Sequence, residues 1–304
     1  MKSPFNNLSV QIIFLFIMIG NISFAQSRIQ KIDKLLDSLY LQQKFNGNIL
    51  IAEKGEIIYN RSYGLANETT KEKITQKSIF ELASCSKQFT AMGIVILKEK
   101  GKLNLDDKIS KYIPELSNYK EISIKNLLHH TGGLPDYMPL LDTVWNKTQI
   151  ATNKDIIEFF SKYKPKILFE PNSKHEYSNT GYVLLATIIE RVSGLTYADY
   201  LKEQIFKPLK MSNSFVYNRR LSPKKIKNYA LGYLFIKSQN KYVLPDDYEK
   251  TKMVYWLDGV VGDGTVNSNV IDLLKWDRSL YTSKLVSGES LKEIFANGLL
   301  NNGS

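Results

Sequence analysis

Two residues in the stretch Phe80–Ala91 have side chains that could act together as a nucleophile and a base. Ser84 carries a hydroxyl, and Lys87 carries an amine three residues later. Residues three apart on a helix lie on the same face, so the two groups can approach each other. A serine becomes an effective nucleophile when a neighbouring base takes its proton. The spacing alone is not specific, because it recurs at four other places: Ser117/Lys120, Ser161/Lys164, Ser222/Lys225 and Ser238/Lys241.

The single cysteine, Cys85, lies between these two residues, and one cysteine excludes an internal disulfide framework. We expect Cys85 to be a buried small apolar residue, with a reactive thiol as the alternative. Thiolate metal cages are excluded for the same reason, and the histidines do not have a metal-binding spacing: His129, His130 and His175. The sequence therefore predicts neither a metal site nor a cofactor.

The position of Ser84 depends on the element that carries it, and the sequence predicts that Ser84 opens a buried helix. Apolar residues occupy nearly every face from Met92 to Leu97, and Gly101 ends the pattern. A helix N-terminus favours negative charge that develops beside it. A nucleophile at the start of a buried helix is also held rigidly, as catalysis requires.

The rest of the chain places a helical block, residues 84–210, between β-rich ends. On the N-terminal side, Ser27 can cap a helix to about residue 45, and residues 47–53 and 56–59 flank Lys54-Gly55 as a hairpin. On the C-terminal side we expect, in order, extended segments at 229–236 and 241–244, a glycine-rich bend at 259–264, and helices at about 269–281 and 287–296. This order indicates an α+β architecture with a site where the parts meet.

The composition is that of a globular protein, with 43% hydrophobic and 23% charged residues in a chain of 304. The formal net charge is +11, and it comes from scattered lysines whose densest cluster is Lys224-Lys225-x-Lys227. No nucleic-acid-binding module surrounds that cluster. We therefore interpret the lysines as a solvated surface and expect no nucleic-acid partner.

Residues 1–25 have the pattern of a signal peptide. Lys2 is positive, residues 10–19 are apolar, and Ser23-Phe24-Ala25 fits a cleavage site before Gln26. The apolar run is short for a membrane span, and the alternative is an uncleaved N-terminal anchor. The sequence thus predicts an exported protein, periplasmic or secreted, with one domain over residues 26–304 and no stable membrane span after signal cleavage.

The chain resembles the serine β-lactamase-like proteins, in particular the branch of class C β-lactamases, penicillin-binding proteins and esterases. The resemblance covers about residues 30–304 and depends on several segments together: 80–91, 101–109, 111–115, 124–136, 177–194 and 262–276. It implies a β-lactamase/transpeptidase-like α+β fold, in which an antiparallel sheet is flanked by helices and the helical part is a subdomain. Only Ser84-x-x-Lys87 lies within the family's pattern, which distinguishes Ser84 from the other four serines.

The resemblance also implies the site residues. Tyr177-Ser178-Asn179 matches the family's Tyr-x-Asn element and is the only such triplet among 18 tyrosines. By resemblance, Ser84 attacks a carbonyl to form an acyl-enzyme, Lys87 and Tyr177 share the proton transfers, and Asn179 binds substrate and orients Lys87. The alternative for Tyr177 is a packed tyrosine that caps a helix. The expected substrate is a β-lactam, a peptidoglycan-type peptide of the cell wall or an ester, and the sequence does not choose among them.

One element of the family is missing. The second oxyanion donor comes from a strand with Lys-Thr-Gly or His/Trp-x-Gly, but no Lys-x-Gly is present, and His130-Thr131-Gly132 precedes Tyr177. We interpret His130 as a structural turn residue. The last strands of the sheet are therefore expected to be missing, which favours a C-terminally truncated chain over a degraded relative. Thr265 also stands where relatives commonly have a glycine. The alternatives to a hydrolase are a ligand- or peptide-binding relative and a fragment without function.

Overall fold

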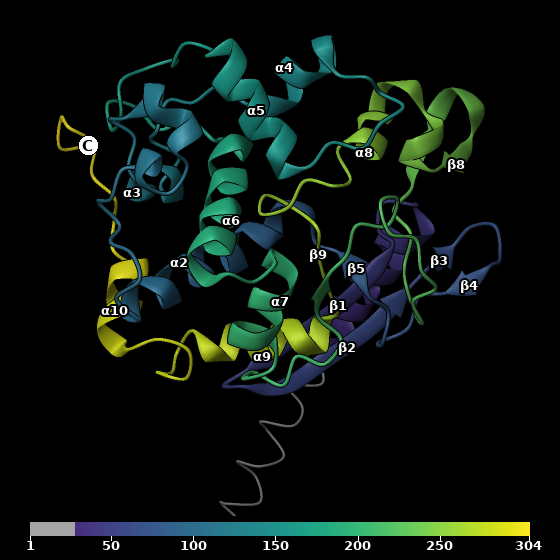
Figure 1. The fold of residues 1–304 in the computed structure, drawn as a ribbon. Coiled ribbons are helices and arrows are strands. Elements are labelled where there is room, and N and C mark those ends of the chain that lie inside the picture. The colour runs from purple at the N-terminus through teal and green to yellow at the C-terminus, as the bar shows by residue number, and fades with distance from the viewer. Residues whose placement is uncertain (1–27) are drawn as a thin grey trace, which may run out of the picture. The chain divides into compact units, whose positions relative to one another are not determined.

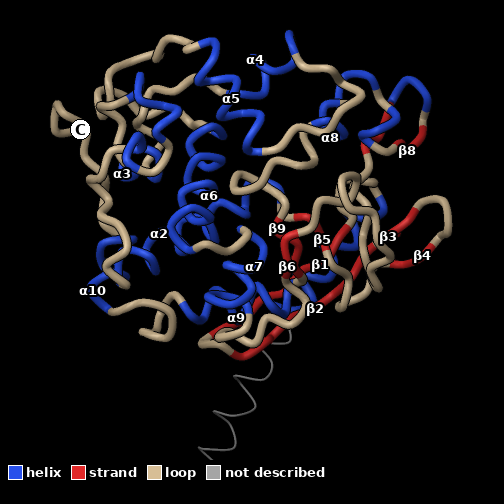
Figure 2. The backbone as a smooth tube through the Cα atoms, in the orientation of Figure 1, coloured by secondary structure: helices blue, strands red, loops and turns tan. Residues whose placement is uncertain are grey.

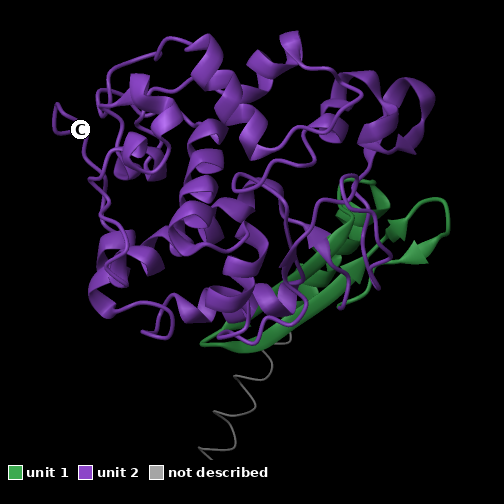
Figure 3. Cartoon of the chain, in the orientation of Figure 1, with its two compact units in different colours: residues 1–76 green, residues 77–304 purple. Residues whose placement is uncertain are grey.

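The structure, a computed structural model, describes residues 28–304, and contacts within the chain define two compact units, 1–76 and 77–304 (Figure 3). The predicted signal peptide, residues 1–25, lies outside the described residues. Among the helices of residues 28–304, none is both long and apolar enough to cross a membrane.

The first unit contains the predicted hairpin. β1 (Gly47–Glu53) pairs antiparallel with β2 (Glu56–Tyr63), with Gly47 opposite Tyr63 and Glu53 opposite Glu56. Lys54 and Gly55 both have positive φ values, +48° and +89°, as in the type I′ turns whose twist matches that of paired strands. β2 runs past the expected end at residue 59. Within the described residues this sheet consists of β1 and β2.

Two smaller features complete the first unit. Residues 28–41 are helical, which confirms the expected helix but ends it before residue 45. β3 (Leu65–Asn67) and β4 (Glu72–Lys73) form a second antiparallel pair.

The second unit contains the helical block, in which α2 (Lys87–Glu99) and α6 (Asn179–Ser193) pack together (Figure 1). Both helices are buried over most of their length. Gly93 makes a close approach possible, because a Cβ there would lie only 2.9 Å from the Ile189 side chain. The apolar core is built from residues of this unit, between Phe89 and Val286. The two helices that carry the predicted site motifs are therefore fixed against each other by the core.

A short antiparallel sheet leads the chain into the Ser84 turn. β9 (Val266–Ser268) is its central strand, with β5 (Phe80–Glu81) on one side and β6 (Phe215–Val216) on the other. Phe80 lies opposite Ser268, and Phe215 lies opposite Asn267. Because β9 directly follows the glycine-rich bend at 259–264, this pairing brings the bend next to the segment that carries Ser84.

The remaining elements of this unit are connected by long loops (Figure 2): α3 (Ile124–Leu128), α4 (Tyr137–Val144), α5 (Asn153–Tyr163), α7 (Tyr197–Leu201), α8 (Met253–Trp256), α9 (Val270–Ser279), α10 (Gly288–Ile294), β7 (Leu234–Ile236) and β8 (Lys241–Val243). Asn269 caps α9, since it accepts a hydrogen bond from the Asp272 amide. The extended segment expected at 229–236 is a strand only from Leu234. Helices α4 and α8 were not predicted.

Candidate active site

Ser84 and Lys87 lie at the start of α2, on a tighter turn than the sequence predicts. Ala83–Ser86 is a 3-10 turn, and the α-helix begins at Lys87. Ala83 has a φ of +45°, so the chain bends sharply as it leaves β5. Ser84 is exposed, whereas Lys87 is only 6% exposed. Lys87 Nζ lies 3.2 Å from Ser84 Oγ, which places the amine and the hydroxyl within hydrogen-bond distance.

Tyr177 and Asn179 approach these two side chains from the start of α6. Ser178 between them is extended, with φ −136° and ψ 120°, and alternate side chains of an extended chain point to the same side. The Tyr177 hydroxyl donates to Ser84 Oγ at 2.8 Å. Lys87 Nζ donates to Asn179 Oδ1 at 2.9 Å. The structure thus brings together all four side chains that the sequence singled out.

Asp136, which sequence reasoning did not identify as a site residue, orients the Asn179 amide. One oxygen of Asp136 accepts from Asn179 Nδ2 at 2.7 Å and from the Asn179 backbone at 3.2 Å. Its other oxygen caps α4 by accepting from the Met138 amide. With its amide nitrogen held by Asp136, Asn179 must direct Oδ1 toward Lys87. The sequence signal here is Pro135-Asp136, which indicates a turn but does not identify a partner for Asn179.

The glycine-rich bend provides a third contact to Lys87. Lys87 Nζ donates to the Asp263 carbonyl oxygen at 2.9 Å. The neighbouring Gly262 has a φ of +107°, and a Cβ there would lie 2.3 Å from the Tyr182 carbonyl oxygen. Only glycine can therefore bring the bend this close to α6.

Asn153 fixes the same bend from α5. Its amide nitrogen donates to the carbonyl oxygens of Val183 and Val261, both at 3.1 Å, and its oxygen accepts from the Val261 amide at 2.8 Å. Asn153 is buried, so these bonds are made away from water. These hydrogen bonds of Asn153 connect α5, α6 and the bend, and they thereby hold the bend whose carbonyl contacts Lys87.

The Asp263 side chain lies in the same buried region. Its carboxyl accepts a hydrogen bond from the Tyr137 hydroxyl at 2.9 Å. Burial raises the pKa of Asp263, while the positive charge of Lys87 and the Tyr137 hydrogen bond oppose that rise. Burial and the nearby Asp263 carboxyl also raise the pKa of Tyr137. Tyr137 therefore remains a hydrogen-bond donor at neutral pH.

His130 supports the segment that carries Tyr177. The Ser178 amide donates to His130 Nδ1 at 3.1 Å, and the His130 ring lies 4.6 Å from the Tyr177 ring. Burial, followed by the charges of His175 and Lys87, lowers the pKa of His130 to about 4. The ring is therefore neutral at pH 7 and can accept this bond. The predicted turn is present, since His130 has a φ of +57°.

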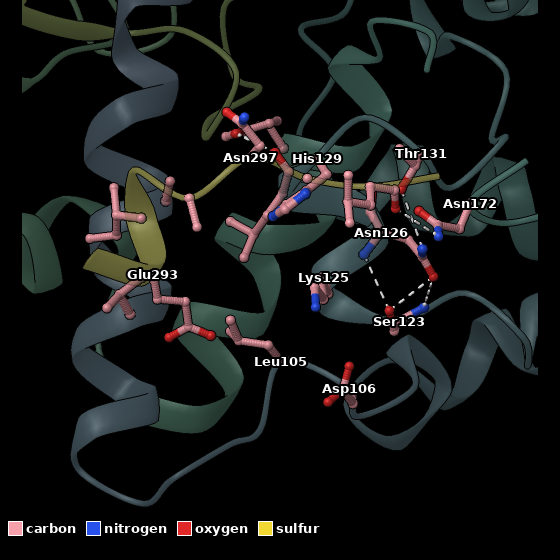
Figure 4. A pocket seen from close by; sticks show the side chains of 18 residues that line it. Leu105, Asp106, Ser123, Lys125, Asn126, His129, Thr131, Asn172, Glu293 and Asn297 are labelled. Carbon is pink, nitrogen blue, oxygen red and sulfur yellow. Dashed lines mark hydrogen bonds between the residues drawn. The ribbon is translucent and has the colours of Figure 1, made fainter. Parts of the chain in front are cut away.

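Ser84 borders a cavity of about 440 Å³, which is also lined by Tyr137, Asn179, Arg219 and Thr265. We call this cavity the reaction cleft. A second cavity, of about 610 Å³, lies elsewhere in the same unit, with Lys125, His129 and Glu293 around it (Figure 4). Ser84, Lys87 and Tyr177 do not line the second cavity, so its size alone does not make it the site of reaction.

The prediction for Cys85 is wrong, because the residue is exposed rather than buried. It follows Ser84 in the 3-10 turn, where the chain has not yet entered the buried helix. Helical spacing from Ser84 could not show which way that tighter turn directs its side chain. Within residues 28–304, no group of His, Cys, Asp and Glu side chains has the arrangement of a metal site.

The comparison with protein families matches residues 30–301 to the family described as Beta-lactamase. Among curated proteins, the chain is 45% identical over 278 residues to "Penicillin-binding protein 4*" of Bacillus subtilis strain 168, covering 91% of this chain and 61% of that one. It is 31% identical to "Putative penicillin-binding protein PbpX" of the same strain, covering 89% and 63%. The chain thus spans about three fifths of the length of these relatives.

Comparison with solved structures also finds proteins of similar fold. The octameric penicillin-binding protein homologue from Pyrococcus abyssi superposes with a TM-score of 0.74 at 27% identity, covering 89% of this chain and 60% of that one. The D-amino acid amidase from Ochrobactrum anthropi SV3, solved with L-phenylalanine, superposes with a TM-score of 0.68 at 27% identity, covering 84% and 72%.

Proposed function

The chain belongs to the β-lactamase family and has its α+β fold, and from this premise we propose that it is an exported serine hydrolase that works through an acyl-enzyme. Its relatives are penicillin-binding proteins and an amidase, which supports a small molecule or peptide as substrate: a β-lactam, a peptidoglycan-type peptide or an ester. One observation carries the proposal. Ser84 Oγ lies within hydrogen-bond distance of both Lys87 Nζ and the Tyr177 hydroxyl.

The contacts of Lys87 support its role as the base. A neutral amine has two N–H groups and one lone pair. Asn179 Oδ1 and the Asp263 carbonyl oxygen, each 2.9 Å from Nζ, can accept the two N–H groups. The lone pair is then left for Ser84 Oγ, the third neighbour, at 3.2 Å. A base that must take the serine proton needs this arrangement.

In acylation, Ser84 Oγ bonds to the substrate carbonyl carbon while its proton passes to the Lys87–Tyr177 pair. The carbonyl C–N or C–O bond then breaks, and Tyr177 delivers a proton to the leaving nitrogen or oxygen. In deacylation, water attacks the ester, the acid product leaves, and Ser84 regains its proton. The Ser84 amide supplies one donor to the oxyanion. The family's second donor, on a Lys-x-Gly or His-x-Gly strand after Tyr177, has no counterpart in this sequence.

That missing motif motivates the alternative, a relative that binds a ligand or peptide without hydrolysing it. The two functions differ in covalent chemistry at Ser84. We expect the protein to form an adduct with a fluorescent penicillin, or to turn over a chromogenic β-lactam or ester. Mass spectrometry of the digested adduct should locate the label on the peptide that contains Ser84.

Ser84→Ala should abolish both adduct and turnover. Ser161→Ala is the matched control, because Ser161 also precedes a lysine by three residues but lies within α5. Labelling that survives Ser84→Ala would refute the proposed nucleophile. Reversible binding of the same penicillin without adduct or turnover would favour the non-enzymatic alternative.

Export through a signal peptide is part of the proposal. The apolar run at 10–19 and the small residues at 23–25 support it. N-terminal sequencing of protein recovered from outside the cytoplasm should begin at Gln26. Recovery of a chain that still begins at Met1 would instead support an uncleaved anchor.

A further inference from the structure

The wall of the reaction cleft carries two arginines, Arg219 and Arg220, just after β6. Arg220 is fully engaged in the protein. Its Nε and one Nη donate to the two oxygens of Asp246, and the other Nη donates to Asp258 at 2.8 Å. The Arg220 side chain is 11% exposed, which fits a structural ion pair.

Arg219 differs from Arg220, because its side chain hydrogen-bonds to a single carboxylate oxygen among the described residues. One Nη donates to Asp246 Oδ2 at 2.8 Å, and Arg220 uses that same oxygen. The side chain is 26% exposed. A guanidinium has five N–H donors, so most of those of Arg219 remain available to a ligand.

Arg219 and Arg220 also line a neighbouring hollow of about 580 Å³, together with Lys224, Lys225 and Asp246. The hollow and the reaction cleft thus share two residues. Four cationic side chains and one carboxylate, that of Asp246, line the hollow. Both oxygens of Asp246 already accept hydrogen bonds from Arg220. The charge balance of the hollow therefore favours an anion.

Lys224 is held in place without a carboxylate partner among residues 28–304. The Tyr217 hydroxyl donates to the Lys224 carbonyl oxygen and accepts from the Lys224 amide, both at 3.0 Å. The ammonium group lies over the Tyr217 ring, 5.2 Å from its centre, and 6.0 Å from that of Phe215. The backbone is fixed while the charge remains exposed, as a binding group requires.

We propose that this hollow binds an anionic group, a carboxylate or a phosphate, on the substrate that Ser84 attacks. The inference rests on the proposed function and adds a substrate class to it. Arginine recognises both groups with paired hydrogen bonds, and a lysine beside it adds a second point charge. The cluster Lys224-Lys225-x-Lys227, which composition alone assigns to a solvated surface, thereby gains a role beside the cleft.

A kinetic comparison tests the proposal with three p-nitrophenyl esters of similar length. One has a neutral acyl chain, one ends in a carboxylate, and one ends in a phosphonate. Arg219→Gln and Lys224→Gln should each lower the ratio of kcat/KM for an anionic ester to kcat/KM for the neutral ester about tenfold. Lys227→Gln, from the same cluster but outside the hollow, should leave this ratio unchanged. Equal losses on neutral and anionic esters would overturn the proposal. The two anionic esters show which anion is preferred.

A binding measurement separates this proposal from the proposed hydrolase activity. Titration of Ser84→Ala protein with the carboxylate ester should give a Kd that rises about tenfold when Arg219→Gln is added and also rises with salt. If no ester is hydrolysed but this difference is found, the hydrolase proposal fails and the anion site stands. A Kd that is unchanged in both Arg219→Gln and Lys224→Gln would overturn the anion site, whatever the hydrolysis.

Discussion

At the scale of single residues, the candidate site depends on how Lys87 is surrounded. Its three hydrogen-bond partners come from three separate parts of the chain: the Ser84 turn, the start of α6 and the 259–264 bend. Two residues at the start of α4 hold the groups that contact Lys87. Asp136 accepts a hydrogen bond from the Asn179 amide, and Tyr137 donates one to the Asp263 carboxyl. The reactive groups are therefore oriented by residues that take no proton themselves, an arrangement in which small displacements are costly.

Asp136→Asn should separate this orienting role from folding. Asparagine can still cap α4 with its oxygen, so we expect nearly unchanged thermal stability. Its NH₂ group would then face Asn179, whose amide must rotate and lose the Oδ1 contact to Lys87. We expect kcat/KM for a chromogenic substrate to fall between about tenfold and a hundredfold. Unchanged activity would mean that Asn179 does not need this partner.

His130 predicts a pH dependence of stability. Its pKa is about 4 in the folded protein and 6.5 in an unfolded chain. Between these values the unfolded state binds the extra proton, so this residue reduces stability as pH falls through that window. His130→Asn removes the group, and asparagine tolerates the positive φ.

Urea unfolding at several pH values between about 4 and 7 measures this effect. The unfolding free energy of the native protein should fall more than that of His130→Asn, by roughly 1–2 kcal/mol after allowance for partial exposure. Parallel pH curves for the two proteins would contradict the assignment.

At the scale of elements, the segment from Asp258 to Ser268 has the greatest influence on the site. It joins the bend that contacts Lys87 to the central strand of the β5–β9–β6 sheet. Gly262 allows the bend to approach α6 closely. Thr265 follows with a φ of +74°, a conformation that is costly for a β-branched residue. Strain is thus concentrated at this threonine.

Thr265→Gly should therefore stabilise the protein. Relief of the backbone strain is worth about 1–3 kcal/mol, and the greater freedom of glycine in the unfolded chain offsets about 0.5–1 kcal/mol of it. We expect a net gain of about 1 kcal/mol in the free energy of unfolding, measured with urea. Thr265→Ser keeps the positive φ and should gain less. A loss of stability in Thr265→Gly would show that the threonine side chain contributes more than its backbone costs.

At the scale of the whole molecule, the two compact units differ in how they are stabilised. The main apolar core is built from the second unit, while the first has a two-stranded sheet in which Ile57 is 45% exposed. A two-stranded sheet leaves alternate amides unpaired and is marginal by itself. Local opening should therefore cost less in the hairpin than in the buried helix α6.

Hydrogen exchange followed by mass spectrometry tests this difference. Peptides from β1 and β2 should exchange well before peptides from Val183–Ile189, which are buried throughout. The α2 peptides, also buried, should behave as those of α6 do. Equal protection of the hairpin and α6 would show that the first unit is stabilised as strongly as the second.

Much of the fold could be predicted because its signals are local. The Lys54-Gly55 turn and the apolar pattern from Met92 to Leu97 each depend on residues within one or two turns of each other. The family pattern also distinguished Ser84 from four equivalent serines. Helix α4 was missed because its first turn reads as the end of a loop rather than as a helix start.

The sequence by itself determined the candidate nucleophile, its lysine, the Tyr-x-Asn element and the fold class. Only the tertiary structure placed Asp136 behind Asn179, put the Asp263 carbonyl on Lys87, exposed Cys85 and set Arg219 beside the cleft. The reason is physical. Helix and strand periodicity and the motifs of the resembled family can be recognised in the sequence, whereas these contacts join residues many positions apart. Core packing and the close approach at Gly262 create them, and neither has a periodic signature.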